Sequence, residues 1–313
     1  MGVVTGLLIF LLILAVLVYL AARRSMERIR DNPDPYPLSD LMRQPTGQQT
    51  QIRRPDGTVL EAIAEGSGPT VVFVHGFAIS MLEWNILWAK LRGTHRLIAY
   101  DHRGHGSSTI GSEGISSSSM AADLVAVLEH FDVQDGVLVG HSMGGFISIV
   151  ALLEQAERIQ PRLRHAVIMA SFAGDVGNGS PQNRLQIPLI QWGILPAVVG
   201  NPVLGGAFGM SLFGAQPAPS QVETFRWDFA RQRHGSLVPI LKAFLHENHY
   251  PRLGEIAVPC TIVCGEKDNT TPPQHSEWLT KGVKNGRFIR IPQVGHVLNW
   301  EAPDRIIEII RSV

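Results

Sequence analysis

The sequence predicts an α/β protein: a mostly parallel sheet flanked by helices, with an inserted helical cap and an N-terminal transmembrane helix. Short runs rich in Val, Ile and Leu alternate with helical patterns over residues 48–173 and again over 256–313, and such alternation is typical of parallel sheets. The alternation stops over residues 174–255, a stretch too long for a loop. Residues 1–22 are almost entirely apolar and are long enough to cross a bilayer as a helix.

The predicted anchor, residues 1–22, is followed by basic residues. Val3 to Ala22 contains no charged residue, and four arginines follow it immediately: Arg23, Arg24, Arg28 and Arg30. A cleavable signal peptide begins with basic residues and has a shorter apolar core, so we expect an uncleaved single-pass anchor. Because segments rich in Lys and Arg stay in the cytoplasm, the following domain is predicted to be cytoplasmic. The alternative is a secreted protein whose leader is removed.

Residues 23–47 are predicted to form a basic juxtamembrane segment and a proline-rich linker. The prolines at positions 33, 35 and 37 argue against a helix there, because proline lacks an N–H and restricts the residue before it. Two strands, 48–53 and 58–65, are then expected around Pro55-Asp56-Gly57, a sequence that favours a hairpin turn.

The first part of the core, residues 48–173, continues as strands that alternate with helices. Further strands are expected at 71–74, 96–100, 136–139 and 165–170, and helices at 82–91, 120–131 and 146–159. Ser119 is the expected N-cap of the second of these helices, because a serine hydroxyl accepts a bond from a free backbone N–H. The second part, residues 256–313, is predicted to add strands at 260–264 and 287–291.

The predicted cap, residues 174–255, has two halves of different character. Residues 185–214 carry almost no charge, whereas residues 222–250 are more polar and favour helices. The apolar half is interpreted either as packing over the sheet or as a lid that faces lipid and lines an acyl tunnel. Trp192 and Trp227 are the cap residues that we expect to contact a substrate.

Gly140-His141-Ser142-Met143-Gly144 has the G-x-S-x-G spacing that presents a reactive serine. A strand-like apolar run precedes this motif and a helix-like run follows it, so Ser142 is expected on a sharp strand-to-helix turn. The flanking glycines avoid clashes in such a turn. His141 is interpreted as a packing residue that points away from the serine.

A serine hydroxyl needs a base that takes its proton and an acid that orients the base. Asp268 and His296 each follow a predicted strand near the end of the chain. Both are therefore expected at the carboxyl edge of the sheet, where parallel sheets gather their chemistry. We predict a catalytic set of Ser142, His296 and Asp268, with Glu266 as the alternative acid.

An oxyanion hole is expected beside the serine. Phe77 follows the strand at 71–74, and Met143 begins the helix after the serine. Gly76 allows the backbone to approach a substrate carbonyl closely, so the N–H groups of Phe77 and Met143 are the predicted donors.

Four motifs, in this order, resemble those of the α/β-hydrolase superfamily over roughly residues 48–313. In chain order they are Asp101-His102-Arg103-Gly104-His105-Gly106-Ser107-Ser108, the serine motif at 140–145, Gly265-Glu266-Lys267-Asp268, and Val294-Gly295-His296. The chain is most similar to the capped branch with monoacylglycerol lipases, carboxylesterases, haloperoxidase-like perhydrolases and carbon–carbon bond hydrolases. Epoxide hydrolases and haloalkane dehalogenases share the scaffold but carry an aspartate where this chain has Ser142.

Together with the apolar segment at 1–22, the resemblance implies a membrane-anchored serine hydrolase that cleaves carboxylic esters. A lipid-like ester such as a monoacylglycerol is the expected substrate, and an acyl-enzyme is the expected intermediate. One alternative is the same triad acting on a thioester or amide, in perhydrolysis, or on a carbon–carbon bond. Another is a hydrolase-fold ligand sensor or scaffold with little turnover. The N-terminal helix would contact membrane lipids. Arg103 is expected to tie loops together, and Asp123 to support helix packing.

Other site classes are disfavoured by the sequence. Lys+Arg and Asp+Glu number 27 each, so a nucleic-acid partner is not expected. His246 and His249 are three residues apart, whereas the zinc-binding helix motif needs a spacing of four, so no metal site is expected. No organic cofactor is needed by the predicted mechanism. Cys260 and Cys264 lie on one predicted strand about 13 Å apart, too far for a disulfide, and are expected to be buried and reduced.

Overall fold

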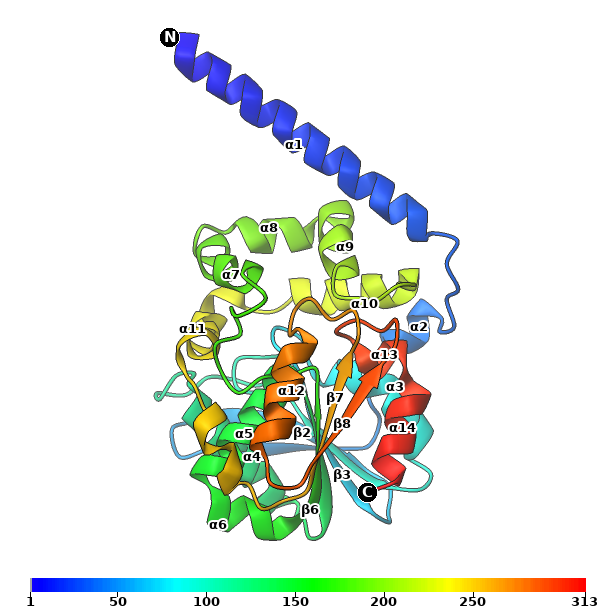
Figure 1. Ribbon diagram of the computed structural model, residues 1–313, viewed down its shortest axis with the longest axis vertical. Coiled ribbons are helices and arrows are strands. Elements are labelled where there is room, and N and C mark those ends of the chain that lie inside the picture. Colours follow the sequence, from blue (N-terminus) through cyan, green and yellow to red (C-terminus); the bar gives the residue numbers. More distant parts are fainter. Residues whose placement is uncertain (1) are drawn as a thin grey trace.

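The computed structural model describes residues 2–313, with side chains from residue 4 onward, around one eight-stranded sheet (Figure 1). The strands are β1 (Gln48–Arg53), β2 (Val59–Glu65), β3 (Thr70–Val74), β4 (Arg96–Tyr100), β5 (Gly136–His141), β6 (Leu163–Met169), β7 (Cys260–Gly265) and β8 (Gly286–Ile291). Their order across the sheet is β1-β2-β4-β3-β5-β6-β7-β8. The pairings β1–β2 and β2–β4 are antiparallel, and the others are parallel. The predicted mostly parallel sheet is confirmed.

Helices cover both faces of the sheet. They are α3 (Asn85–Leu91), α4 (Ser117–His130), α5 (Met143–Glu154), α6 (Ala156–Ile159), α12 (Pro273–Gly282), α13 (Leu298–Glu301) and α14 (Pro303–Arg311), with the 3₁₀ helices η1 (Met81–Trp84) and η2 (Gln160–Arg162). Successive side chains of a strand point to opposite faces. In β3, Val72 and Val74 join the core cluster that contains α4 and α5, whereas Val71 and Phe73 join the cluster that contains α3 and α14. Burial on both faces explains the continuous apolar run of this strand.

The sheet register sets which loops lie side by side at the carboxyl edge. Val74 of β3 pairs with Gly140 of β5, so the segments that follow these two strands leave the sheet together. Gly265 of β7 pairs with Ile291 of β8, which brings the next two loops together in the same way. Four loops that are far apart in the chain therefore meet above one edge.

A group of helices lies between β6 and β7. It comprises α7 (Gln182–Gln191), α8 (Ile194–Gly200), α9 (Pro202–Met210), α10 (Pro219–Ala230) and α11 (Val238–His246), with the 3₁₀ helices η3 (His234–Leu237) and η4 (Tyr250–Glu255). Figure 1 shows α7 to α10 above the carboxyl edge of the sheet. We refer to these helices as the cap.

The N-terminal helix α1 (Gly2–Ile29) is long and apolar enough to cross a membrane. The short helix α2 (Leu38–Leu41) follows it after the proline-rich segment. Residue 1 of the predicted anchor lies outside the described residues. The helix does not end near residue 22: it continues to Ile29, because Ala22 and Ile29 are buried against the folded domain and support the last turns. The segment predicted as a basic linker thus begins as helix.

Some helix boundaries differ from the prediction. Ser116, not Ser119, is the N-cap of α4. Its hydroxyl accepts from the Ser119 N–H at 3.0 Å, while the Ser119 hydroxyl accepts from the Ser116 N–H at 3.0 Å. This reciprocal pair satisfies two free N–H groups and so begins the helix one turn earlier. The predicted helix at 82–91 is divided into η1 and α3.

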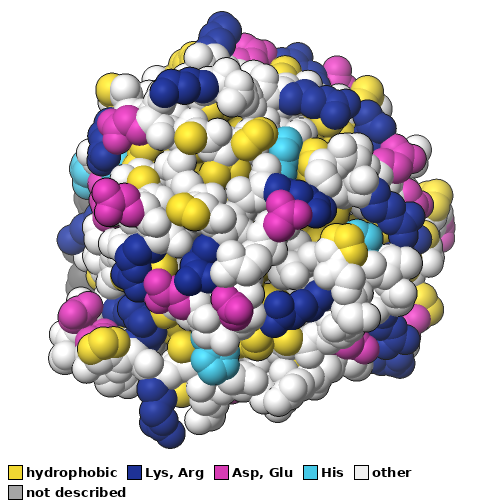
Figure 2. Space-filling model, turned by 90° about the horizontal axis from the view of Figure 1, so that it is seen from below, with side chains coloured by type: hydrophobic (Ala, Val, Ile, Leu, Met, Phe, Trp, Pro, Cys, Tyr) yellow, Lys and Arg dark blue, Asp and Glu magenta, His cyan; other side chains and the backbone are white. Residues whose placement is uncertain are grey.

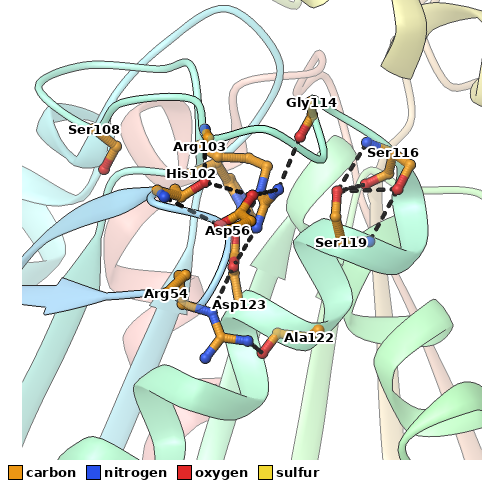
Figure 3. A network of polar contacts seen from close by, with 12 residues as sticks. Arg54, Asp56, His102, Arg103, Ser108, Gly114, Ser116, Ser119, Ala122 and Asp123 are labelled. Carbon is orange, nitrogen blue, oxygen red and sulfur yellow. Dashed lines mark hydrogen bonds and ion pairs between the residues drawn. The ribbon is translucent and has the colours of Figure 1, made fainter.

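Arg103 joins three segments next to the sheet (Figure 3). Its guanidinium donates to both carboxylate oxygens of Asp123 on α4, at 2.6 and 2.8 Å, and to Asp56 in the hairpin turn at 3.0 Å. It also donates to the Gly114 carbonyl at 2.8 Å, and Arg54 adds a second cation to Asp123 at 3.0 Å. Arg103 and Asp123 are buried, and buried charges are tolerated only when they are paired. The predicted role of Arg103 in tying loops together is confirmed.

Replacing Arg103 by leucine leaves the carboxylates of Asp123 and Asp56 without their main partner. We expect Arg103→Leu to lower the free energy of unfolding by about 3–5 kcal/mol, as for other broken buried pairs, measured by urea denaturation. Arg158→Leu is the matched control. Arg158 also makes two bonds to one carboxylate, that of Glu129, but its side chain is 49% exposed, so its loss should cost less than about 1 kcal/mol. Equal effects of the two variants would contradict the structural role of Arg103.

Candidate active site

Ser142 lies on a strained turn between β5 and α5. Its backbone has φ 52° and ψ −117°, a conformation that L-residues rarely adopt and that the surrounding structure must hold in place. A Cβ on Gly140 would lie 2.8 Å from the Gly144 carbonyl oxygen, and a Cβ on Gly144 would overlap the carbonyl oxygen of Val74. Glycine is required at both positions, and the turn presents Ser142 to a cavity.

His296 and Asp268 face each other in the loops after β8 and β7. The His296 Nδ1 lies 2.9 Å from Asp268 Oδ2. Asp268 also accepts bonds from the Thr270 N–H at 2.8 Å, the Thr271 N–H at 2.9 Å and the Thr271 hydroxyl at 2.8 Å. Burial acts to raise the pKa of Asp268, but the electrostatic interaction with His296 and these hydrogen bonds outweigh burial and lower it. An ionised Asp268 keeps the imidazole proton on Nδ1, which leaves Nε2 as a base.

Glu266, the alternative acid, points elsewhere. It is exposed, and its carboxylate accepts from the backbone N–H of Gln293 at 3.1 Å and from the side-chain amide of Gln293 at 3.2 Å. Of the two candidate acids, Asp268 is the one that contacts His296.

The cavity beside Ser142 lies between the core and the cap. Ser142, His296, Gly76 and Phe77 line its floor, and its walls are mainly aromatic and aliphatic, including Phe172, Phe208, Phe225, Phe229, Leu241 and Phe244. Five further polar side chains also line it: His141, Asn183, Gln186, Thr270 and Thr271. An apolar cavity with a few polar groups is the usual form of a small-molecule site.

Two backbone N–H groups are available beside Ser142. A Cβ added to Gly76 would lie 3.5 Å from Ser142 Cβ, which shows how closely the loop after β3 approaches the serine. Within residues 2–313, the N–H groups of Phe77 and Met143 make no backbone hydrogen bond. The described contacts also contain no bond between Ser142 Oγ and His296. Such catalytic bonds are often long without substrate and tighten when it binds.

His141 has a different environment from the one that the sequence suggested. It does not merely pack: its Nδ1 lies 3.0 Å from Glu83 Oε2, and its Nε2 lies 2.9 Å from the carbonyl oxygen of His296. The second Glu83 oxygen accepts from the Gly76 N–H at 3.0 Å. Burial opposes a charge on His141, but the Glu83 carboxylate and the two hydrogen bonds outweigh burial and raise the pKa of His141. This buried pair joins the loops that carry Gly76, Ser142 and His296.

Sequence reasoning missed Glu83. A glutamate within an apolar helical pattern is an unusual core residue, and this was the available signal. Its carboxylate binds the Gly76 N–H in the loop after β3 and His141 at the end of β5, 58 positions away in the chain, so only the folded chain identifies what it binds.

Glu301 forms a second connection, between the cap and the loop of His296. Its carboxylate accepts from the Gly214 N–H at 2.7 Å and from the Gly295 N–H at 3.1 Å. The His296 N–H donates to the carbonyl of Leu212 at 2.7 Å. The segment after α9 is therefore bonded along the loop that carries His296.

The expected substrate contacts of two cap tryptophans differ from the observed site. Trp192 and Trp227 are not among the described residues that line the cavity. Trp192 is 74% exposed, and Trp227 lies under the guanidinium of Arg231. His249 pairs with Glu247 at 2.9 Å, and the described residues contain no cluster of three or more His, Cys, Asp or Glu side chains that could hold a metal. Both cysteines are free and buried in β7.

The Glu83–His141 pair should control the reactivity of Ser142. Glu83→Leu removes the acceptor for His141 and for the Gly76 N–H, so we expect labelling of Ser142 by a fluorophosphonate to slow about 100-fold, the effect of a misplacement of about 1 Å. Glu83→Gln keeps an acceptor of the same size and should slow labelling less than about tenfold. Circular dichroism checks that both variants fold. Equal labelling rates in Glu83→Leu and the parent would contradict the positioning role.

Glu301 should give the stability of the chain a specific pH dependence. Burial raises its pKa from 4.5 to about 7, so the folded chain binds the proton more tightly than the unfolded chain. The contribution of Glu301 to stability is therefore present below pH 4.5 and is lost as the pH rises towards 7. Glu301→Gln removes this titration. The free energy of unfolding of the variant, relative to the parent, should rise between these pH values in urea titrations, and a constant difference would contradict the assignment.

Comparisons with known proteins agree with this fold. Residues 71–309 match the profile described as the alpha/beta hydrolase family. A non-heme haloperoxidase from Rhodococcus erythropolis is 29% identical over 258 residues, which cover 77% of this chain and 90% of the relative. The 3-oxoadipate enol-lactonase 2 of Acinetobacter baylyi is 22% identical over 246 residues, which cover 78% and 88% of the two chains.

Solved structures show the same fold. An esterase from Exiguobacterium antarcticum superposes with a TM-score of 0.76 at 22% identity, and the match covers 85% of this chain and 98% of that one. A bromoperoxidase from Bacillus anthracis superposes with a TM-score of 0.73 at 20% identity, covering 85% and 99%. The eight-stranded sheet, the turn at Ser142 and the match over residues 71–309 lead to one conclusion: the chain belongs to the alpha/beta hydrolase family and is a hydrolase-type enzyme.

Proposed function

We propose that this protein is a membrane-anchored serine hydrolase that cleaves carboxylic esters, with lipid-like esters such as monoacylglycerols as its substrates. One observation carries the proposal: Ser142 sits on a strained turn and shares an apolar cavity with His296, which in turn contacts the ionised Asp268. This arrangement is the one that activates a serine for acyl transfer.

In the proposed mechanism, Ser142 Oγ attacks the ester carbonyl while His296 Nε2 takes its proton. Asp268 holds the imidazole and stabilises its positive form. The N–H groups of Phe77 and Met143 bind the tetrahedral oxyanion, and each such donor is typically worth about 3 kcal/mol. His296 then protonates the leaving alcohol. Water, deprotonated by His296, attacks the acyl-enzyme and releases the acid and Ser142.

The lipid-like substrate is supported by the cavity and by α1. The cavity walls are rich in phenylalanine and leucine, which suit an acyl chain. The apolar helix α1 would hold the enzyme at the bilayer, where such esters concentrate. The arginines after residue 22 support a cytoplasmic catalytic domain, because basic flanks stay on that side. Protection of the domain from added protease in sealed inverted vesicles would contradict this orientation.

A second candidate is perhydrolysis or lactone hydrolysis by the same triad. The names of two relatives, a non-heme haloperoxidase and an enol-lactonase, favour it. In this reaction hydrogen peroxide, not water, would attack the acyl-enzyme, or the ester would be cyclic.

The decisive experiment is hydrolysis of acyl esters from acetate to palmitate, with monoacylglycerols included. We expect the highest kcat/KM on medium or long chains, because each buried methylene contributes about 0.8 kcal/mol. Ser142→Ala should lower kcat by about a million-fold, since the triad acts as a unit, while the chain remains folded.

Ser112→Ala is the matched serine control. Ser112 lies in an exposed loop of the core, so this variant should keep full activity. Thr5→Ala would not serve as a control, because position 5 lies in the predicted membrane span. Turnover that persists in Ser142→Ala would refute the serine mechanism. Activity confined to short esters would refute the lipid-like substrate and favour the second candidate.

A further inference from the structure

The carboxyl-terminal part of α1 packs against the cap, and the segment that follows α1 is hydrogen-bonded to it. Met26 packs so closely on α9 that a Cβ on Gly206 would lie 2.9 Å from its thioether sulfur. Asn32 Nδ2 donates to the Pro217 carbonyl at 3.1 Å, and the Ser220 N–H donates to Asp34 at 2.8 Å. The apolar helix therefore has a defined position relative to the cap.

Exposed hydrophobic side chains gather on the same part of the molecule. Outside α1, five large hydrophobic side chains of the described residues are exposed, and three of them belong to the cap: Leu185 at 59%, Trp192 at 74% and Ile194 at 43%. We call these three the α7–α8 tip. Gly193 has φ 70°, a conformation that favours glycine, and this turn leaves the Trp192 ring projecting into solvent.

The α7–α8 tip lies at the end of the molecule that carries α1. Figure 1 shows α7, α8 and α9 at this end, with α1 running obliquely above them and the sheet on the far side. The opposite end, seen in Figure 2, carries basic and acidic side chains interspersed with small hydrophobic spots. The end that carries α1 and the α7–α8 tip therefore suits an apolar environment, and the opposite end suits water.

The chemistry of the tip suits a lipid surface. Between Arg184 and Glu223 the sequence contains no charged residue, so inserting this segment among headgroups buries no charge. Tryptophan is enriched at the interface between headgroups and acyl chains, where its amphipathic ring is most stable. An exposed tryptophan in an uncharged segment, held beside an apolar spanning helix, has the composition of an interfacial contact.

We propose that the α7–α8 tip inserts into the headgroup layer of the same bilayer that α1 crosses. This inference rests on the anchor in the proposed function and names the second membrane contact of the enzyme. Gln186 of α7 and Phe208 of α9 line the cavity, so insertion places the roof of the cavity on the bilayer. A lipid ester then reaches Ser142 between cap helices without crossing water.

Quenching of tryptophan fluorescence by brominated lipid tests the contact directly and needs no catalytic activity. The full chain is incorporated into phosphatidylcholine nanodiscs, with acyl chains either unmodified or brominated near the headgroup. The chain has six tryptophans, and we expect bromine to quench one of them, Trp192. Trp192→Phe should abolish this quenching, and hydrolysis of a soluble ester should be unchanged.

Trp278→Phe is the matched control. Trp278 is also exposed, at 37%, but it lies on α12, where its ring packs beside Tyr250. Quenching in this variant should equal that of the parent. Quenching that persists in Trp192→Phe, or is absent from the parent in discs, would overturn the proposed contact while leaving the anchor intact.

Two further outcomes are distinguishable. If the full chain does not enter nanodiscs and is extracted from membranes by alkaline carbonate, both the anchor and the tip contact fail. If the chain enters discs as pairs, and Trp192 is shielded from bromine only in the paired form, the tip binds a second copy of the chain and the lipid contact is overturned. Mass measurement of the loaded discs separates one copy from two.

Discussion

The close approach of the backbone around Ser142 is the constraint on which the rest of the site depends. A serine at φ 52° is held there only because the surrounding segments leave it no alternative. Gly144 must lie against the Val74 carbonyl, so β3 and β5 have to be neighbours in a fixed register. The same register brings the loop of Gly76 and Phe77 against the serine. One strained turn thus requires both the strand order and the glycines.

Two carboxylates, the buried Glu83 and the half-buried Glu301, hold the remaining loops to this turn. Glu83 bonds to Gly76 and His141, and His141 in turn bonds to the carbonyl of His296. Glu301 bonds the same histidine loop to the segment after α9. A charged group in the interior costs free energy unless every acceptor is used, and here each carboxylate bonds to two loops. This free-energy cost is consistent with a need for fixed geometry at the candidate site.

The cap links this geometry to the N-terminal helix. α9 contacts Met26 on one side, and the segment that follows it bonds to the His296 loop on the other. Asp228 on α10 accepts from the N–H and hydroxyl of Ser80, at 2.8 and 2.9 Å, which attaches the cap to the loop after β3. These bonds fix the cap to the core both at the loop after β3 and at the loop of His296, and the apolar helix leaves from the outer surface of the cap (Figure 1).

The sequence by itself determined the alternation of strands and helices, the apolar helix, and the order Ser142, Asp268, His296. Each of these depends on local patterns: hydrophobic periodicity, glycine spacing around a turn, and position just after a strand. The strand edges at Arg96 and Tyr100 were predicted correctly for this reason. The N-cap of α4 was misplaced because both Ser116 and Ser119 are good caps, and only their reciprocal bonds select Ser116.

The tertiary structure alone decided which groups meet. Glu266 and Asp268 are two residues apart, and the turn after β7 directs one to solvent and the other to His296. His141 looked like a packing residue because Glu83 lies far from it in the chain. Trp192 looked like a substrate contact because its exposure depends on how α7 and α8 meet. Contacts between distant segments follow from strand register and helix packing, which no local pattern in the sequence encodes.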